Sequence, residues 1–170
     1  YNNQVRQNIW DAPLFSDVNT MVGVSTLGII GLGRIGKSVC RKAQGLGMKV
    51  VYYDKFRASE EIEKEYNVVY KPFDEILAQS DCIAVHVPYL PENNHMFNAE
   101  TFAKMKPSAY FVNTARGKLM DEAALCRALK NGVIKGAALD VFEQEPKVYE
   151  ELLSLDNVVL TPHVASLTMH

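Results

Sequence analysis

The stretch Thr26-Leu27-Gly28-Ile29-Ile30-Gly31-Leu32-Gly33-Arg34-Ile35-Gly36 decides the fold that we predict for this chain. Its apolar start, residues 27–30, is typical of a buried strand, and three glycines follow at the G-x-G-x-x-G spacing of a dinucleotide-binding turn. Gly31 allows a sharp turn, Gly33 allows a pyrophosphate to approach the backbone, and Gly36 allows a helix to pack closely on the sheet. The alternative is a tight strand-to-helix turn that binds no ligand.

An acidic residue at the end of the next apolar run favours the ligand-binding interpretation. Residues 49–53 are predicted to form a second strand, and Asp54 follows it directly. A carboxylate at this place can accept hydrogen bonds from the ribose of NAD and would repel the 2′-phosphate of NADP. Lys55 and Arg57 come next, and they either soften this preference or are solvated loop charges.

The composition is that of an ordinary globular domain. The 170 residues are 48% hydrophobic and 22% charged, and the net charge of -2 argues against nucleic-acid or anionic-membrane partners held by bulk electrostatics. No apolar run approaches the roughly 18 residues of a membrane span, and no signal-peptide pattern is present. Cys40, Cys82 and Cys126 form no C-x-x-C pair, so we expect buried core residues in a reducing cytoplasm and no metal site.

The chain divides into a short arm and one domain. Residues 1–24 combine a helix-like spacing that includes Trp10 with a polar, irregular segment, and we interpret them as a helix end and a connecting arm. Residues 25–170 are predicted to form a single domain. The chain starts with Tyr1, in the middle of a pattern, so we expect it to be a piece of a longer protein.

Strand-like and helical patterns alternate from residue 26 onward. The predicted strands are 26–30, 49–53, 68–70, 81–87, 109–113, 135–141 and 157–160, and the predicted helices are 34–46, one opening at 59–61, 72–78, 98–105, 121–131 and 149–153. The strands are continuous apolar runs, as a parallel sheet covered on both faces requires. We therefore predict a Rossmann-type α/β fold, a doubly wound parallel sheet with the strand order 3-2-1-4-5-6.

Candidate chemical groups follow the later strands, whose carboxyl ends form the ligand-binding edge of such a sheet. Arg116 follows the fifth strand, Glu143 and Glu145 follow the sixth, and His163 follows the last. A cation, a carboxylate and an imidazole at one edge suit hydride transfer at a carbonyl next to a carboxylate, because that reaction needs a substrate clamp and an acid/base. The residues alone do not choose between the two glutamates, and any of these groups can instead be a surface or loop residue.

Five further motifs follow the glycine-rich stretch along the chain. They are His86-Val87-Pro88, Met105-Lys106-Pro107, Val112-Asn113-Thr114-Ala115-Arg116-Gly117, Ala138-Leu139-Asp140-Val141-Phe142-Glu143-Gln144-Glu145-Pro146 and Thr161-Pro162-His163. With the glycine-rich stretch, they resemble the NAD-binding domain of the D-isomer-specific 2-hydroxyacid dehydrogenases, the family of D-3-phosphoglycerate, D-lactate and glyoxylate/hydroxypyruvate enzymes. The resemblance covers nearly all of residues 26–168.

The resemblance implies a role for each matching residue. Arg116 would bind the carboxylate and carbonyl of the substrate, His163 would act as the acid/base, and Glu145 would orient the imidazole and favour its protonated form. Asp140 would bind the nicotinamide carboxamide. The implied NAD-binding residues are Gly31, Gly33, Arg34, Ile35, Gly36, Asp54, His86, Val87, Pro88, Thr114, Ala115, Arg116, Asp140 and His163.

The resemblance also implies what the protein does. It predicts an NAD-dependent oxidoreductase that acts on the CH–OH group and reversibly transfers hydride between NAD(H) and a 2-keto or 2-hydroxy acid. The second, substrate-binding domain of the family is absent from this chain, so we expect NAD binding with little turnover. The resemblance also implies that the protein can form a homodimer through this domain.

Two alternatives remain open. The first is a non-catalytic, NADH-sensing interaction module, like the transcriptional corepressors that share this fold and these residues. The second is a formate-type dehydrogenase, although such an enzyme would have Gln rather than Glu at position 145.

Overall fold

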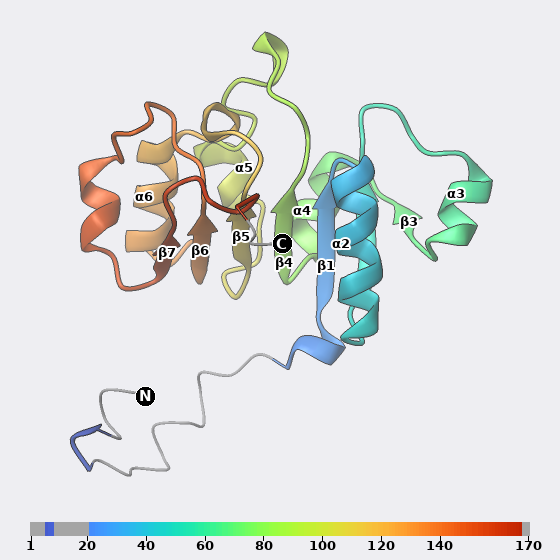
Figure 1. Ribbon diagram of the computed structural model, residues 1–170, viewed down its shortest axis with the longest axis horizontal. Coiled ribbons are helices and arrows are strands. Elements are labelled where there is room, and N and C mark those ends of the chain that lie inside the picture. The colour runs from blue at the N-terminus through green and yellow to red at the C-terminus, as the bar shows by residue number, and fades with distance from the viewer. Residues whose placement is uncertain (1–5, 9–20, 168–170) are drawn as a thin grey trace.

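Seven parallel strands form one sheet in the order β3-β2-β1-β4-β5-β6-β7 in the computed structural model, which describes residues 6–8 and 21–167 (Figure 1). The strands are β1 Thr26–Ile30, β2 Lys49–Tyr53, β3 Val69–Tyr70, β4 Cys82–Val85, β5 Tyr110–Asn113, β6 Gly136–Leu139 and β7 Val158–Leu160. Each neighbouring pair is parallel. The predicted order 3-2-1-4-5-6 is confirmed, and β7 adds a strand beside β6.

Helices connect the strands as the patterns predict, although α2, α5 and α6 are shorter than predicted and α4 is shifted by one residue. The α-helices are α2 Arg34–Gly45, α3 Glu60–Glu65, α4 Phe73–Gln79, α5 Ala99–Ala103 and α6 Glu122–Lys130, and the 3-10 helices are η2 Val22–Val24, η3 Pro91–Asn93, η4 Gly117–Leu119 and η5 Glu150–Ser154. The helix predicted near residues 149–153 is thus a 3-10 helix. Trp10 and most of the predicted arm lie outside the described residues.

Side-chain caps explain where two of the helices begin. The Asn98 side chain accepts hydrogen bonds from the backbone N–H groups of Glu100 and Thr101, and the Asp121 side chain accepts one from Ala124 at 2.8 Å. By contrast, the Ser59 side chain accepts no hydrogen bond from the described backbone at the start of α3.

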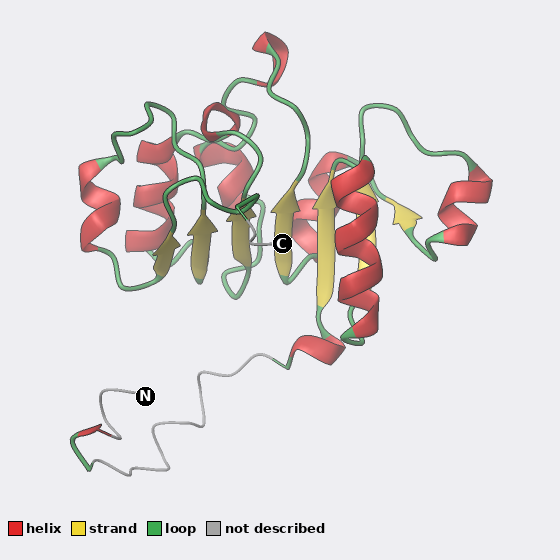
Figure 2. Cartoon of the chain, viewed as in Figure 1, coloured by secondary structure: helices red, strands yellow, loops and turns green. Residues whose placement is uncertain are grey.

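Two apolar clusters lie on opposite faces of the sheet. The larger one joins α4, α5 and α6 to the sheet and includes Phe102, Phe111 and Leu125, which are completely buried. The smaller one lies under α2 and α3 and includes Cys40 and Tyr52. Figure 2 shows α2 beside β1 on the front of the sheet, with α4 and α5 behind the strands. This arrangement is the doubly wound one expected from continuous apolar strands.

The α2 side of β5, β6 and β7 stays open in the described part of the chain. Val112 and Ala138 are partly exposed there, Val159 is 63% exposed, and these residues border a hollow of about 780 Å³ that also contacts Cys82. Within the described residues, helices therefore cover both faces of the sheet over β1 and β2 but only one face over β5–β7. The expected burial of all three cysteines is also wrong for Cys82, which is partly exposed.

No helix in the described ranges combines the length and the apolar character needed to cross a membrane. The same residues contain no group of three or more His, Cys, Asp or Glu side chains placed to hold a metal ion.

Candidate functional site

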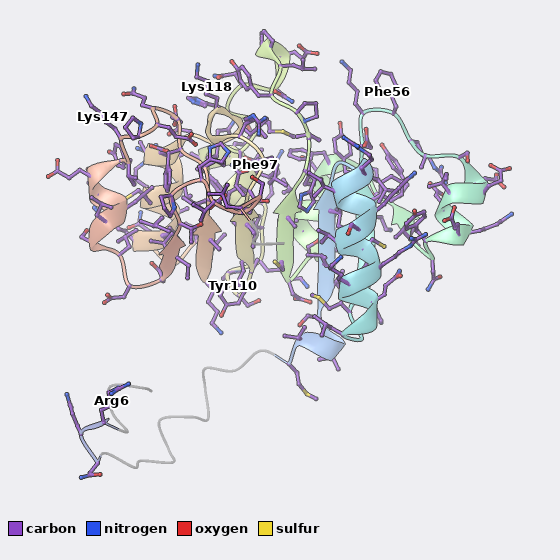
Figure 3. The ribbon with its side chains drawn as sticks, in the orientation of Figure 1. Arg6, Phe56, Phe97, Tyr110, Lys118 and Lys147 are labelled. Atoms are coloured by element: carbon purple, nitrogen blue, oxygen red, sulfur yellow. The ribbon has the colours of Figure 1, made fainter. Side chains whose placement is uncertain are left out.

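The carboxyl ends of all seven strands lie along one edge of the sheet. The arrowheads in Figure 1 point to this edge, and the segments that follow the strands gather above it. Figure 3 places Lys118, which follows β5, on this side and Tyr110, at the start of β5, on the other. Parallel α/β sheets bind ligands at this edge, so the predicted site residues are described from here.

The turn between β1 and α2 is tightly packed on its inner side and open on its outer side. Gly31 has φ +98, and a Cβ added to it would lie 2.8 Å from the Val87 side chain. A Cβ on Gly36 would overlap the Gly31 carbonyl, whereas one on Gly33 would meet no atom of the described residues within 4 Å. Since α2 also begins without a side-chain cap, its positive end is open to an anion. These features fit a pyrophosphate.

Asp54 ties this turn to the end of β2. One carboxylate oxygen accepts a hydrogen bond from the Leu32 N–H at 2.9 Å, and the other accepts one from the Phe56 N–H at 3.2 Å. The two cations that follow Asp54 are both paired with carboxylates: the Lys55 ammonium is 3.4 Å from Glu92, and the Arg57 guanidinium contacts Glu63 at 2.8 and 2.9 Å.

The segment after β4 places His86 and Val87 beside the glycine turn. The His86 N–H donates to the Ile30 carbonyl at 2.7 Å, and Val87 packs against Gly31. The Nε2 atom of His86 is buried and has no hydrogen-bond partner among the described residues. Burial lowers the pKa of His86, so the ring is neutral at pH 7. A buried ring nitrogen that the described residues leave without a partner, next to the glycine turn, is consistent with a polar ligand there.

Asn113 shapes the loop that carries Arg116. Its completely buried side chain accepts a hydrogen bond from the Ala115 N–H at 3.0 Å and donates one to the Arg116 carbonyl at 2.9 Å. The next residue, Gly117, lies so close to Phe142 that a Cβ would overlap the Phe142 carbonyl. The Arg116 loop therefore rests on the segment that carries Glu145.

Glu145, rather than Glu143, contacts His163. Its Oε2 atom lies 2.8 Å from Nδ1 of His163, and its Oε1 atom accepts a hydrogen bond from the Phe142 N–H at 3.0 Å. These two hydrogen bonds, with the nearby positive charge of Arg116, lower the pKa of Glu145. The carboxylate is therefore ionised at neutral pH and faces the imidazole, as a base-orienting group must.

Asp140 holds the turn on which His163 lies. Its carboxylate is only 3% exposed and accepts hydrogen bonds from the Thr161 hydroxyl and from the N–H groups of Val164 and Ala165, both at 2.9 Å. Burial opposes ionisation of Asp140, but these hydrogen bonds outweigh it and lower its pKa. Its predicted contact with the nicotinamide stays a prediction, as do the NAD-binding roles of Val87 and Pro88.

The sequence interpretation missed a second carboxylate–imidazole contact. Glu143 and Glu122 exchange hydrogen bonds, each carboxylate accepting from the other residue's N–H at 2.8 Å, and Nε2 of His95 lies 3.0 Å from Oε2 of Glu143. Burial raises the pKa of Glu122, which is only 6% exposed. Glu143 is thus a structural group that fastens its loop to α6. The signal in the sequence for the Glu122–Glu143 contact was the position of Glu122, an acidic residue in the first turn of a helix.

One cleft of about 630 Å³ extends from Ile35, in the first turn of α2, to the Glu145–His163 pair. Its lining includes Ile35, His86, Arg116, Phe142, Glu145 and His163. Ile35 belongs to the first turn of α2 and is 65% exposed, so it forms a wall of the cleft rather than part of the core. Thr114 is exposed on the loop before Arg116. The structure thus brings Arg116, Glu145 and His163 together with part of the predicted cofactor-binding set, whereas Gly31, Gly33, Asp54, Thr114 and Asp140 do not line this cleft.

Comparisons with known proteins give consistent matches. Residues 1–165 match the family described as D-isomer specific 2-hydroxyacid dehydrogenase, NAD binding domain. The glyoxylate reductase of Pyrococcus furiosus is 51% identical over 143 residues, which are 84% of this chain and 42% of the reductase. That of Korarchaeum cryptofilum is 52% identical over 142 residues, 83% of this chain and 42% of the reductase.

Solved structures agree with these matches. The apo D-mandelate dehydrogenase of Rhodotorula graminis superposes with a TM-score of 0.87 at 39% identity, over 98% of this chain and 47% of the other. The D-lactate dehydrogenase of Lactobacillus jensenii, solved with NAD+, gives 0.85 at 33% identity, over 98% of this chain and 53% of the other. The chain spans about half the length of the proteins that it matches.

Proposed function

The chain belongs to the D-isomer-specific 2-hydroxyacid dehydrogenase family, whose NAD-binding domain it matches, and from this premise we propose its activity. It provides the NAD-binding part of an oxidoreductase that acts on the CH–OH group and interconverts a 2-keto and a 2-hydroxy acid. The observation that carries this proposal is the shared cleft, in which Ile35 at the start of α2 lies with Arg116, Glu145 and His163.

The roles of the three polar groups follow from their chemistry. When bound, NADH supplies the hydride for the carbonyl carbon. The Arg116 guanidinium binds the substrate carboxylate and polarises the carbonyl, because its planar fork suits both oxygens. His163 donates a proton to the carbonyl oxygen in reduction and accepts it from the hydroxyl in oxidation. Glu145, 2.8 Å from Nδ1, fixes the ring so that Nε2 faces the substrate.

The proposed cofactor-binding residues follow the carboxyl ends of β1, β2, β4 and β5, along the edge of the sheet that carries this cleft. The turn from Gly31 to Gly36 holds the pyrophosphate, and Asp54 accepts hydrogen bonds from the adenosine ribose. The segment at His86 borders the adenine side, and the loop of Thr114 borders the nicotinamide side. Among the described residues, the open space outside Gly33 and the lack of a partner for Nε2 of His86 support this placement.

The substrate is proposed to be a short 2-keto acid. The relatives that are 50–52% identical are named glyoxylate reductases, so glyoxylate is the first substrate to test. We propose that a substrate-binding domain outside this chain completes the pocket, since the chain covers 42% of those reductases. The cleft is open without such a domain, so water is not excluded and turnover by this chain alone is expected to be poor.

The cellular setting and assembly are proposals as well. Cys40, Cys82 and Cys126 are all free thiols, which suits a reducing cytoplasm. Homodimerisation through this domain follows from the family resemblance, and analytical ultracentrifugation of the chain tests it. No nucleic-acid or membrane partner is proposed.

Titration of NADH into the 170-residue chain tests the proposal directly. We expect saturable binding, followed by the fluorescence of the bound nicotinamide, with glyoxylate reduction appearing only when a substrate-binding domain is present. An absence of saturable binding up to millimolar NADH would contradict the proposal. The corepressor-type alternative gains no support from the named relatives, which are reductases and dehydrogenases, and Glu145 argues against a formate-type enzyme.

A further inference from the structure

Glu63 binds Arg57 through both of its carboxylate oxygens. The guanidinium Nε atom lies 2.8 Å from Oε1 and the Nη2 atom lies 2.9 Å from Oε2, which is the paired geometry that arginine and carboxylate groups prefer. The Glu63 side chain is only 14% exposed, whereas that of Arg57 is 60% exposed. The pair is therefore anchored from the α3 side, where solvent does not reach the carboxylate easily.

Buried groups hold this pair in place. The completely buried Tyr52 donates its hydroxyl to Oε1 of Glu63 at 2.7 Å, and the same hydroxyl accepts a hydrogen bond from the Ala58 N–H at 3.0 Å. The guanidinium also lies over the Tyr70 ring, 5.3 Å from its centre. Hydrogen bonds from Arg57 and Tyr52 lower the pKa of Glu63 to about 2, so the glutamate is charged at neutral pH. Arg57 is thus neutralised in a fixed position.

The position of Arg57 gives this contact a functional meaning. Arg57 lies three residues after Asp54, in the segment that leaves the carboxyl end of β2. Its neighbour Phe56, 80% exposed, projects from this segment in Figure 3. An arginine near this strand end accommodates the 2′-phosphate in NADP-binding sites, whereas a carboxylate there selects NAD. This chain carries both groups, Asp54 and Arg57.

We propose that Glu63 is a specificity-determining residue that favours NAD over NADP by keeping Arg57 paired and unavailable to a 2′-phosphate. Glu63 is a positioning residue, since it acts through Arg57. Lys55 is the other cation of this segment. Glu92 does not hold it as firmly as Glu63 holds Arg57, because the 3.4 Å contact between Lys55 and Glu92 is between two exposed side chains. The inference rests on the proposed cofactor site and adds to it the control of cofactor choice.

The substitution Glu63→Gln tests the inference, because Gln keeps the shape and an acceptor for Tyr52 but removes the charge. Calorimetric titrations of the chain use NADH, NADPH, 5′-AMP and 2′,5′-ADP. We expect the Kd values of NADH and 5′-AMP to stay within about twofold, and those of NADPH and 2′,5′-ADP to fall by about tenfold, since one charge-assisted contact is gained. The gain should disappear in the double variant Glu63→Gln/Arg57→Ala.

Three comparisons keep the test decisive. The control is Glu65→Gln, because Glu65 lies on α3 as Glu63 does. This substitution breaks the 2.9 Å ion pair between Glu65 and Arg41 and should change none of the four affinities. Arg57→Ala alone should leave NADPH binding unchanged, because Arg57 is already paired. A large loss of NADPH affinity in Arg57→Ala would mean that Arg57 already contacts the 2′-phosphate in the wild type, and this result overturns the inference.

Asp54 itself could mask the gain, so the titrations are repeated with Asp54→Asn. The effect of Glu63→Gln on NADPH should be larger in that background, because one repulsive charge is gone. If Glu63→Gln leaves the ratio of NADPH to NADH affinity unchanged in both the wild-type and the Asp54→Asn background while NADH still binds, the inference is overturned and the proposed function is not. A wild-type chain that does not bind NADH overturns the proposed function and this inference with it.

Discussion

The Nδ1 atom of His163 lies 2.8 Å from Oε2 of Glu145, although 18 residues separate the two along the chain. Each partner has its own anchor: the Phe142 N–H holds the carboxylate of Glu145, and Asp140 holds the turn of His163. Contacts within the chain therefore hold the two groups together. Preformed geometry of this kind reduces the reorganisation that a proton transfer requires.

Replacing Glu145 with Gln should slow catalysis without weakening binding. The amide keeps the size of the side chain but cannot favour a protonated imidazole, so we expect kcat for glyoxylate reduction to fall about a hundredfold. KM should change little, since Arg116 rather than Glu145 is proposed to bind the substrate. Steady-state kinetics of the protein with its substrate-binding domain measure both constants.

Glu150→Gln is the matched control for this substitution. Glu150 is exposed and lies five residues further on, outside the cleft that contains His163. Its replacement should leave kcat unchanged. Equal rates for Glu145→Gln and wild type would show that the contact with His163 has no part in proton transfer.

Replacing Asp140 with Asn should loosen the turn that carries His163. The buried carboxylate accepts three hydrogen bonds from residues 161–165, and Asn can reproduce only part of this set. We expect the free energy of unfolding to fall by about 1–3 kcal/mol. Hydrogen exchange of the Val164 and Ala165 amides should accelerate. The exposed Asp156 provides the control, and Asp156→Asn should change neither quantity.

Acid should remove the same interaction. The pKa of Asp140 is lower in the folded chain than its ordinary value of 3.8, so its contribution to stability is present above that value and is lost as the pH falls through the folded pKa. The difference in unfolding free energy between wild type and Asp140→Asn should stay constant from about pH 7 to pH 5 and shrink below about pH 4. Urea titrations across this range measure it, and a difference that widens in acid would contradict the assigned sign.

The sequence predicted the sheet correctly because strand-like apolar runs and helical patterns alternated along the chain. Apolar runs marked all seven strands, and the family resemblance and strand order were confirmed. The bounds were less accurate: the strand predicted at residues 81–87 ends at Val85, since backbone pairing rather than apolar character ends a strand. The open face over β5–β7 was missed as well, because a continuous apolar run does not tell which face a helix covers.

Sequence patterns also could not assign partners to the glutamates. Glu143 and Glu145 are two residues apart, and only the bend of the chain turns Glu145 toward His163 and Glu143 toward His95. Similarly, Arg57 carried no sign of its pairing with Glu63, since the contact depends on where α3 packs against β2. Long-range side-chain contacts of this kind are set by tertiary packing, which local patterns do not encode.

Gly33 offers a test that separates cofactor binding from folding. A Cβ at Gly33 would meet no protein atom within 4 Å, and its φ of -73 is accessible to any residue, so Gly33→Ala should fold normally. The added methyl group would occupy the space assigned to the pyrophosphate, and we expect NADH affinity to fall by about tenfold or more. Fluorescence titration and thermal melting of the same sample give both quantities.

Gly45, the last residue of α2, is the matched control for Gly33. A Cβ there also meets no atom within 4 Å, but Gly45 lies at the other end of the helix from the turn. Gly45→Ala should leave NADH affinity unchanged and raise the free energy of unfolding by up to about 1 kcal/mol, because alanine favours helix. If both variants bind NADH as tightly as wild type, the phosphates do not lie over Gly33, and the cofactor must approach the sheet by another route.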